Sequence, residues 1–316
     1  MSPGAAAGGP PRPDLSVELA GVRLPNPVLA ASGCFGFGRE LTSFVTLDQI
    51  GAIVTKSVSL EPRLGLPTPR MAETPGGMLN AIGLQNPGVE AYRARELPPL
   101  AEAGARVVAS IFGETAAEFA EVAGRLAGEP AVRLLEVNLS CPNVEERGQV
   151  FATSPERAAA VVAAVKARAG QPVLAKLTAD VTDVTAVARA VVDAGADGLV
   201  CVNTLLGMAV DVRRRRPRLA AVTGGLSGPA IRPVALRCAW QVAGALPGVP
   251  VVGCGGILTA EDAAEFLLVG AVAVQVGTGN FVNPRATADV AAGLLELLAE
   301  DGLGSVAELT AGFEGG

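Results

Sequence analysis

The 316-residue chain contains no histidine. Histidine is the side chain that titrates near neutral pH without help, and it is the commonest metal ligand. Its absence excludes a Ser-His-Asp triad, a Cys-His pair and an HExxH zinc site. Proton transfer must therefore use cysteine, lysine, aspartate, glutamate, tyrosine or serine, and we expect no metal in the site.

The sequence also lacks the marks of a secreted, membrane-bound or nucleic-acid-binding protein. Its cysteines are scattered without paired spacing, which fits a reducing compartment; they are Cys34, Cys141, Cys201, Cys238 and Cys254. No apolar run is long enough to span a bilayer, and the opening MSPGAAAGGPPRP is unlike a signal peptide. A net charge of −6 gives no overall positive field. We expect a cytoplasmic protein whose partners are small molecules or proteins, not nucleic acid or membrane.

The apolar content is high, because half of the residues are apolar and only 18% are charged. From residue 28 onward, short β-branched runs alternate with Ala-rich amphipathic stretches, which is the pattern of a parallel sheet. Eight runs are candidate strands: Pro27–Ala31, Ala52–Thr55, Val107–Ser110, Leu134–Asn138, Val173–Leu177, Gly198–Val202, Val251–Gly253 and Ala273–Val276. Eight strand–helix units in about 250 residues predict an α/β protein with a (β/α)8 TIM barrel. We expect one domain over residues 14–316, after a disordered tail over residues 1–13.

An open doubly wound sheet is the alternative architecture. It would normally carry a GxGxxG turn after its first strand, whereas the segment Ser32–Gly38 reads SGCFGFG. The strand count therefore favours the barrel. The segment Leu15–Leu24 alternates around Gly21 like an N-terminal β-hairpin, which could plug the bottom of the barrel.

Polar residues follow the predicted strands, where barrel enzymes carry their chemistry. They are Ser32, Thr55 to Ser57, Ser110, Asn138 to Asn143, Lys176, Asn203 and Thr204. A lone Asn or Ser at a strand end usually caps a helix or satisfies a turn. Lys176 is harder to explain structurally, because a lysine without a partner inside the apolar strand VLAKL would be costly. It predicts an anion or cofactor contact.

Glycines follow the last two predicted strands. Gly255 and Gly256 follow VVGC, and Gly277 and Thr278 follow AVQV. In barrels, the loops after strands seven and eight frequently bind phosphate through bare backbone N–H groups. Each glycine alone could simply make a tight turn. Their joint position favours a phosphorylated cofactor.

Together, these motifs resemble those of dihydroorotate dehydrogenases, specifically the class 1B catalytic subunit. The matching stretches are TKSVS (Thr55–Ser59), GMLNAIGLQNPG (Gly77–Gly88), EVNLSCPN (Glu136–Asn143), AKL (Ala175–Leu177), VNT (Val202–Thr204), TGGLSGPAIRPVALR (Thr223–Arg237), GCGGI (Gly253–Ile257) and VGTG (Val276–Gly279). They span nearly the whole chain, in the order that a barrel requires.

The resemblance implies oxidation of dihydroorotate to orotate in pyrimidine biosynthesis, with FMN as cofactor. Cys141 is implied as the base that removes the C5 proton while the C6 hydride passes to the flavin N5. The implied FMN contacts are Ser32, Lys56, Ser57, Ser110, Asn138, Lys176, Val202, Gly228, Gly255, Gly256, Gly277 and Thr278. The implied substrate contacts are Lys56, Asn80, Ala81, Ile82, Gly83, Leu84, Asn138, Asn203 and Thr204.

Cysteine at position 141 indicates class 1, because relatives in the membrane-associated class 2 use serine there. Class 1B further implies a homodimer core within a heterotetramer and a partner subunit that carries FAD and a [2Fe–2S] cluster. Three alternatives stay open: a stand-alone class 1A enzyme using fumarate, a dihydrouridine synthase, and a cofactor-free scaffold. The acidic charge balance argues against an RNA-binding enzyme, and we interpret the basic run Arg213–Arg218 as a solvated loop.

Overall fold

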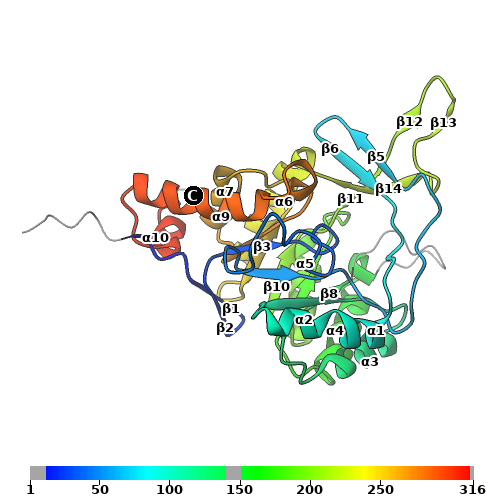
Figure 1. Cartoon of the computed structure of the whole chain (residues 1–316), viewed down its shortest axis with the longest axis horizontal. Coiled ribbons are helices and arrows are strands. Elements are labelled where there is room, and N and C mark those ends of the chain that lie inside the picture. Colours follow the sequence, from blue (N-terminus) through cyan, green and yellow to red (C-terminus); the bar gives the residue numbers. More distant parts are fainter. Residues whose placement is uncertain (1–11, 140–150, 314–316) are drawn as a thin grey trace, which may run out of the picture.

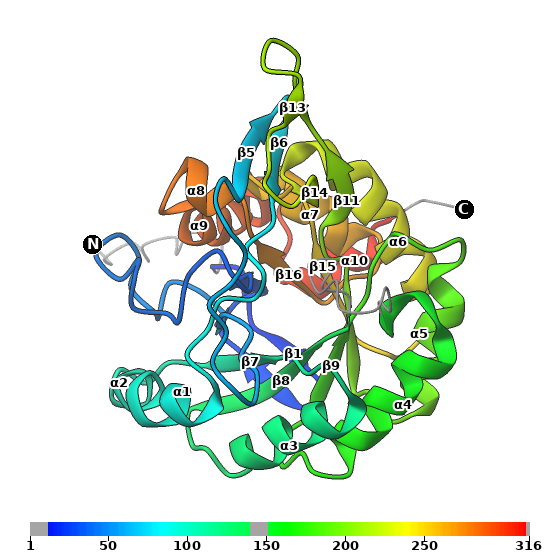
Figure 2. The same cartoon turned by 90° about the vertical axis from the view of Figure 1, so that its right-hand side faces the viewer.

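The structure is a computed structural model that describes residues 12–139 and 151–313. Eight parallel strands close into a barrel in the order β10-β15-β16-β3-β4-β7-β8-β9. Figure 2 looks into this barrel. They are β3 (Val28–Ala30), β4 (Ala52–Val54), β7 (Val107–Ile111), β8 (Val132–Asn138), β9 (Val173–Lys176), β10 (Gly198–Cys201), β15 (Val251–Cys254) and β16 (Ala273–Val276). Each predicted strand matches one of these within two residues at either end. The prediction of a barrel is confirmed, and the alternative of an open doubly wound sheet is wrong.

Helices surround the barrel in Figure 2. They are α1 (Val89–Arg95), α2 (Leu97–Glu102), α3 (Ala116–Leu126), α4 (Pro155–Lys166), α5 (Val184–Asp193), α6 (Arg232–Ala245), α7 (Ala260–Leu268), α8 (Gly279–Val282), α9 (Ala286–Glu300) and α10 (Val306–Ala311), with 3-10 turns η1 (Phe151–Thr153) and η2 (Pro229–Ile231). Side-chain caps start several of them: the Thr115 hydroxyl accepts a bond from the Glu118 amide at α3, for example. In the described part of the chain, no helix combines the length and apolar character needed to cross a membrane.

The N-terminal hairpin closes the bottom of the barrel, as predicted. Strands β1 (Val17–Leu19) and β2 (Val22–Leu24) pair antiparallel around Ala20 and Gly21, whose φ angles of 50° and 78° suit a two-residue hairpin turn. Leu19 and Leu24 are fully buried. They pack against inward-facing residues of the barrel strands, among which are Leu29, Val108, Leu174, Val200 and Val252.

A second sheet, which the sequence did not reveal, lies away from this hairpin in Figure 1. It contains β5 (Met71–Thr74), β6 (Gly77–Asn80), β11 (Leu205–Met208) and β14 (Thr223–Ser227) in the order β11-β14-β6-β5. Its strands come from the long connections after β4 and β10, so the sheet stands beside the carboxyl ends of the barrel strands. Several of these strands are glycine-rich, which hides them from a propensity argument.

A small hairpin of β12 (Val210–Asp211) and β13 (Arg216–Pro217) projects beyond this sheet in Figure 1. It carries the basic run Arg213–Arg218, whose arginines are exposed. This agrees with the interpretation of that run as solvated. Residues 1–11 of the expected tail lie outside the described residues, so the boundary between tail and domain stays a prediction.

Candidate active site

A cavity of about 410 Å³ opens at the carboxyl ends of the barrel strands, beside the second sheet. Its wall gathers residues from loops that are far apart in sequence. Eleven of the twelve predicted FMN contacts line it: Ser32, Lys56, Ser57, Asn138, Lys176, Val202, Gly228, Gly255, Gly256, Gly277 and Thr278. Eight of the nine predicted substrate contacts also line it: Lys56, Asn80, Ile82, Gly83, Leu84, Asn138, Asn203 and Thr204. The structure therefore brings the two sets into one site.

Ser110 and Ala81 are the two exceptions. Ser110 is fully buried, and its hydroxyl lies 2.8 Å from the Ser57 hydroxyl, so it positions Ser57 from below the cavity wall. Ala81 is also fully buried, and its amide donates to the carbonyl of Arg70. Both residues act on the wall through their neighbours, because an alternating strand or a tight loop can turn only some of its side chains toward one cavity.

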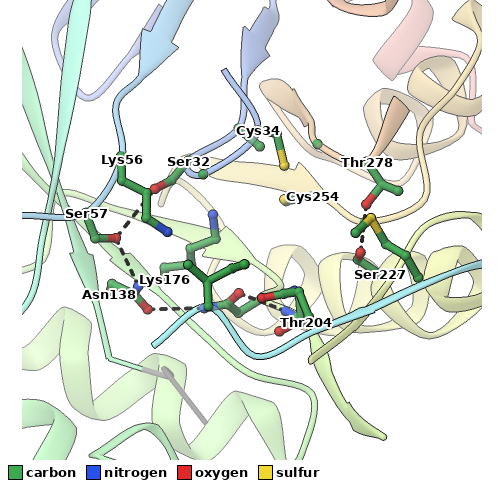
Figure 3. A pocket seen from close by; sticks show the side chains of 18 of the residues that line it. Ser32, Cys34, Lys56, Ser57, Asn138, Lys176, Thr204, Ser227, Cys254 and Thr278 are labelled. Atoms are coloured by element: carbon green, nitrogen blue, oxygen red, sulfur yellow. Dashed lines mark hydrogen bonds between the residues drawn. The ribbon is translucent and has the colours of Figure 1, made fainter. Parts of the chain in front are cut away.

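A chain of hydrogen bonds links the polar side chains along one wall (Figure 3). The Asn138 amide nitrogen donates to the Ser57 hydroxyl at 3.1 Å, and the Asn203 amide nitrogen donates to Asn138 Oδ1 at 3.1 Å. Asn203 Oδ1 in turn accepts from the Thr204 backbone N–H at 2.8 Å. These bonds fix both amide orientations, so the wall presents donors and acceptors in a set order.

The loop after β6 forms another part of the wall. Gly83 and Leu84 adopt positive φ angles of 73° and 56° there. Buried Asn86 holds the loop: its Oδ1 accepts from the Gly88 N–H at 2.9 Å, and its amide nitrogen donates to the Leu84 carbonyl at 2.7 Å. A leucine in the left-handed region is uncommon, and this bonding network supports it.

Lys176 is 5% exposed and lines the cavity, while its contact with an anion or cofactor stays a prediction. Its partners were not predicted. Lys176 Nζ lies 3.3 Å from Glu136 Oε1 and 3.0 Å from Gln275 Oε1. Burial alone would lower the pKa of Lys176, but the charge and the hydrogen bond of the Glu136 carboxylate oppose it, so the pKa is raised and the side chain is a cation.

Bare glycine backbone forms the end of the cavity near β15 and β16. Gly228, Gly255 and Gly256 have φ angles of 96°, 141° and 75°. A Cβ on Gly256 would lie 2.9 Å from the Gly228 carbonyl oxygen, and one on Gly255 would lie 2.7 Å from the Ala235 Cβ. Larger residues are therefore excluded, and the backbone is left open to a ligand.

Two cysteines that the sequence argument passed over, Cys34 and Cys254, also line the cavity. Burial and the neighbouring Cys254 raise the pKa of Cys34 to about 11, although Lys176 and Lys56 oppose the shift. Burial also raises the pKa of Cys254. Both thiols are therefore neutral near pH 7 and are poor bases. Cys141, the predicted base, lies outside the described residues.

No group of three or more His, Cys, Asp or Glu side chains suited to a metal occurs within residues 12–139 and 151–313. The described wall combines amides, hydroxyls and bare peptide N–H groups with the charged side chains of Lys56, Glu136 and Lys176 and the thiols of Cys34 and Cys254. Such a wall suits a flat, polar, anionic ligand at one end and a phosphate at the other.

Comparisons with known proteins bear on the family of the chain. A family model described as dihydroorotate dehydrogenase matches residues 14–298. Three similar proteins bear the name dihydroorotate dehydrogenase B (NAD(+)), catalytic subunit. The one from Geotalea daltonii is 53% identical over 298 residues, which cover 94% of this chain and 97% of that protein. The one from Trichlorobacter lovleyi is 54% identical over 304 residues, covering 96% and 100%. The one from Pelobacter propionicus is 54% identical over 303 residues, covering 96% and 99%.

The family model covers most of the chain, and the relatives are alike over almost their whole length, so the resemblance found in the motifs is confirmed. The chain belongs to the dihydroorotate dehydrogenase family.

Proposed function

We propose that this chain is the FMN-containing catalytic subunit of a dihydroorotate dehydrogenase, an oxidoreductase that forms orotate in pyrimidine biosynthesis. The electrons pass to NAD through a second subunit. The names of the relatives support both parts, because they specify NAD(+) and a catalytic subunit. The observation that carries the proposal is the joining of the glycine cradle, the amide wall and buried Lys176 in one cavity.

The residues present fit FMN. Open peptide N–H groups and the Thr278 hydroxyl at the glycine end would hold its phosphate, through Gly228, Gly255, Gly256, Gly277 and Thr278. The other wall residues proposed for FMN are Ser32, Lys56, Ser57, Asn138, Lys176 and Val202, with Ser110 supporting Ser57. When bound, FMN supplies the acceptor for the hydride that leaves dihydroorotate.

The chain itself binds the substrate and moves the proton. Dihydroorotate is a ring with amide edges and a carboxylate, so Asn80, Asn138, Asn203 and Thr204 can pair with it and Lys56 can balance its charge. The loop Ala81–Leu84 would close over it. Cys141 is proposed to take the C5 proton, which requires its thiolate to be more accessible than that of Cys34.

The proposal also places the enzyme in the cytoplasm, as a homodimer core within a heterotetramer. Cys34, Cys201, Cys238 and Cys254 are free thiols, which supports a reducing compartment. The homodimer and the composition of the partner follow from the resemblance to class 1B.

An absorbance spectrum before and after anaerobic dihydroorotate tests the proposal. We expect a yellow protein whose released cofactor has the mass of FMN and whose flavin band bleaches on addition of dihydroorotate. A flavin that stays oxidised would refute the substrate. A colourless protein that gains no flavin from added FMN would refute the cofactor.

A further inference from the structure

Three side chains from three strands meet in the interior of the barrel, and two of them, Glu136 and Lys176, line the cavity. Glu136 of β8 and Gln275 of β16 are both 0% exposed, and Lys176 of β9 lies between them. The Gln275 amide nitrogen donates to Glu136 Oε2 at 2.7 Å, while Lys176 donates to Gln275 Oε1 at 3.0 Å and to Glu136 Oε1 at 3.3 Å. The three side chains form a closed ring of hydrogen bonds.

This ring fixes the orientation of Gln275. Its amide oxygen faces the ammonium group and its amide nitrogen faces the carboxylate; the reverse orientation would bring an N–H donor against a cation. Gln275 therefore holds both charged groups at once. Leucine or valine at this position would make neither hydrogen bond, so neither the Lys176 ammonium nor the Glu136 carboxylate would be held by residue 275.

The ring aims Lys176 at the cavity. An ammonium group has three N–H donors, and two of them point at Glu136 and Gln275. Figure 3 shows Lys176 among the side chains of the cavity wall. Glu136 also offsets the cost of burying the cation, which an isolated ammonium could avoid only by losing its proton.

We propose that Glu136 and Gln275 are positioning residues that hold Lys176 as a charged group at a fixed place in the cavity wall, and so set how strongly the site would prefer the reduced cofactor. This inference rests on the proposed function. The reduced flavin gains negative charge that the oxidised flavin lacks, so a fixed cation stabilises the two states unequally.

The test measures the midpoint potential of the flavin in purified holoenzyme. Gln275→Met keeps the side-chain length and removes both hydrogen bonds without changing charge. We expect its preference for reduced over oxidised flavin to fall about tenfold, which lowers a two-electron potential by about 30 mV. In Lys176→Met, the midpoint potential is expected to fall by at least as much. The double variant should match Lys176→Met alone, since Gln275 acts through Lys176.

Glu136→Gln provides an independent test of the proposal, which can be used if Gln275→Met fails to fold. Without the carboxylate, burial lowers the pKa of Lys176, so the preference for reduced flavin should fall near neutral pH and recover as the pH is lowered. Among the described residues, the other titratable side chains that line the cavity are Lys56 and the thiols of Cys34 and Cys254, and the raised pKa values of the thiols keep them neutral over that range. Each pH is compared with the unaltered enzyme.

Asn26→Ala is the matched control. Asn26 is 6% exposed, and its Oδ1 accepts from the Val28 N–H at 3.1 Å where β3 begins, at the opposite end of the strand from the cavity. The Asn26→Ala variant should lose stability and keep the midpoint potential of the flavin. Unchanged potentials in Gln275→Met and Glu136→Gln, or effects that add to that of Lys176→Met, would overturn this inference alone. Absence of flavin from the unaltered protein would overturn both this inference and the proposed function.

Discussion

Cysteine shows how strongly the surroundings of a residue decide its chemistry in this chain. Cys34 lines the cavity, yet burial holds its pKa near 11, so it stays a thiol at neutral pH. A base needs the opposite environment, with access to water or a charge that favours the thiolate. Cys141 has polar sequence neighbours, Ser140 and Asn143, which suit that role.

Replacement of Cys141 by alanine should separate cofactor binding from proton removal. We expect Cys141→Ala to retain FMN and to lose flavin reduction by dihydroorotate by a factor of at least about 100, the scale of general-base catalysis. Stopped-flow reduction under anaerobic conditions measures this. Cys34→Ala serves as a matched comparison, since a neutral thiol is no base. Reduction of Cys141→Ala at the unaltered rate would show that the base lies elsewhere.

At single positions, the sequence was informative where a residue type conflicted with its surroundings. Lys176 was identified because a lysine inside an apolar strand needs a partner. The same reasoning applies to Glu136 in LLEVN and Gln275 in AVQVG, and it would have found both. The sequence does not show that these two side chains are partners, because Glu136 and Gln275 are 139 residues apart and meet only when the barrel closes.

At the scale of elements, the barrel strands were predictable because parallel strands buried on both faces are continuous apolar runs. The second sheet was missed because its strands lack such runs. Its strands β6 and β14 contain three glycines between them, and their pairing joins residues more than 140 positions apart, as in Asn80 with Gly225. Neither periodicity nor propensity carries that information.

The N-terminal hairpin should be a structural plug. Leu24→Ala removes a fully buried side chain from the cluster at the bottom of the barrel and should cost about 2–5 kcal/mol of unfolding free energy. Urea unfolding followed by circular dichroism measures the loss. Glu18→Ala, an exposed position in the same hairpin, should change stability by less than about 0.5 kcal/mol. Equal effects of the two changes would contradict the plug.

The glycine cradle gives a prediction about binding. Gly256→Ala places a Cβ 2.6 Å from the Arg232 Cβ and 2.9 Å from the Gly228 carbonyl oxygen, so the phosphate end must distort. We expect FMN affinity to fall by more than about tenfold, or about 1.4 kcal/mol. Gly104→Ala is the matched control: it has a similar φ of +67° but nothing within 4 Å of its Cβ. Fluorescence titration of both variants with FMN measures the two affinities. Backbone strain from a positive φ is common to both variants, so a loss of affinity in Gly256→Ala alone would be due to distortion of the glycine cradle.

At the scale of the whole molecule, the described residues form the proposed flavin site, and the sequence carries no motif typical of a second redox centre. Its five cysteines are spread over positions 34 to 254 without the close spacing that a [2Fe–2S] cluster needs. The turn after β3 reads SGCFGFG, which is not the GxGxxG order of a dinucleotide site. The relatives are nevertheless named for NAD(+) and as one subunit of an assembly.

Electron transfer to NAD should therefore require another polypeptide. The purified single chain should reduce its flavin with dihydroorotate and pass electrons to an artificial dye, because both steps use only groups proposed to lie on this chain. With NAD in place of the dye, turnover should be lower by a factor of at least about 100, the coupling between the flavin and NAD being absent. Adding the electron-transfer subunit should restore NADH formation, measured at its own absorbance band, without changing the rate of flavin reduction by dihydroorotate. Rapid formation of NADH by the single chain would place the NAD site on this polypeptide and contradict the division of labour between subunits.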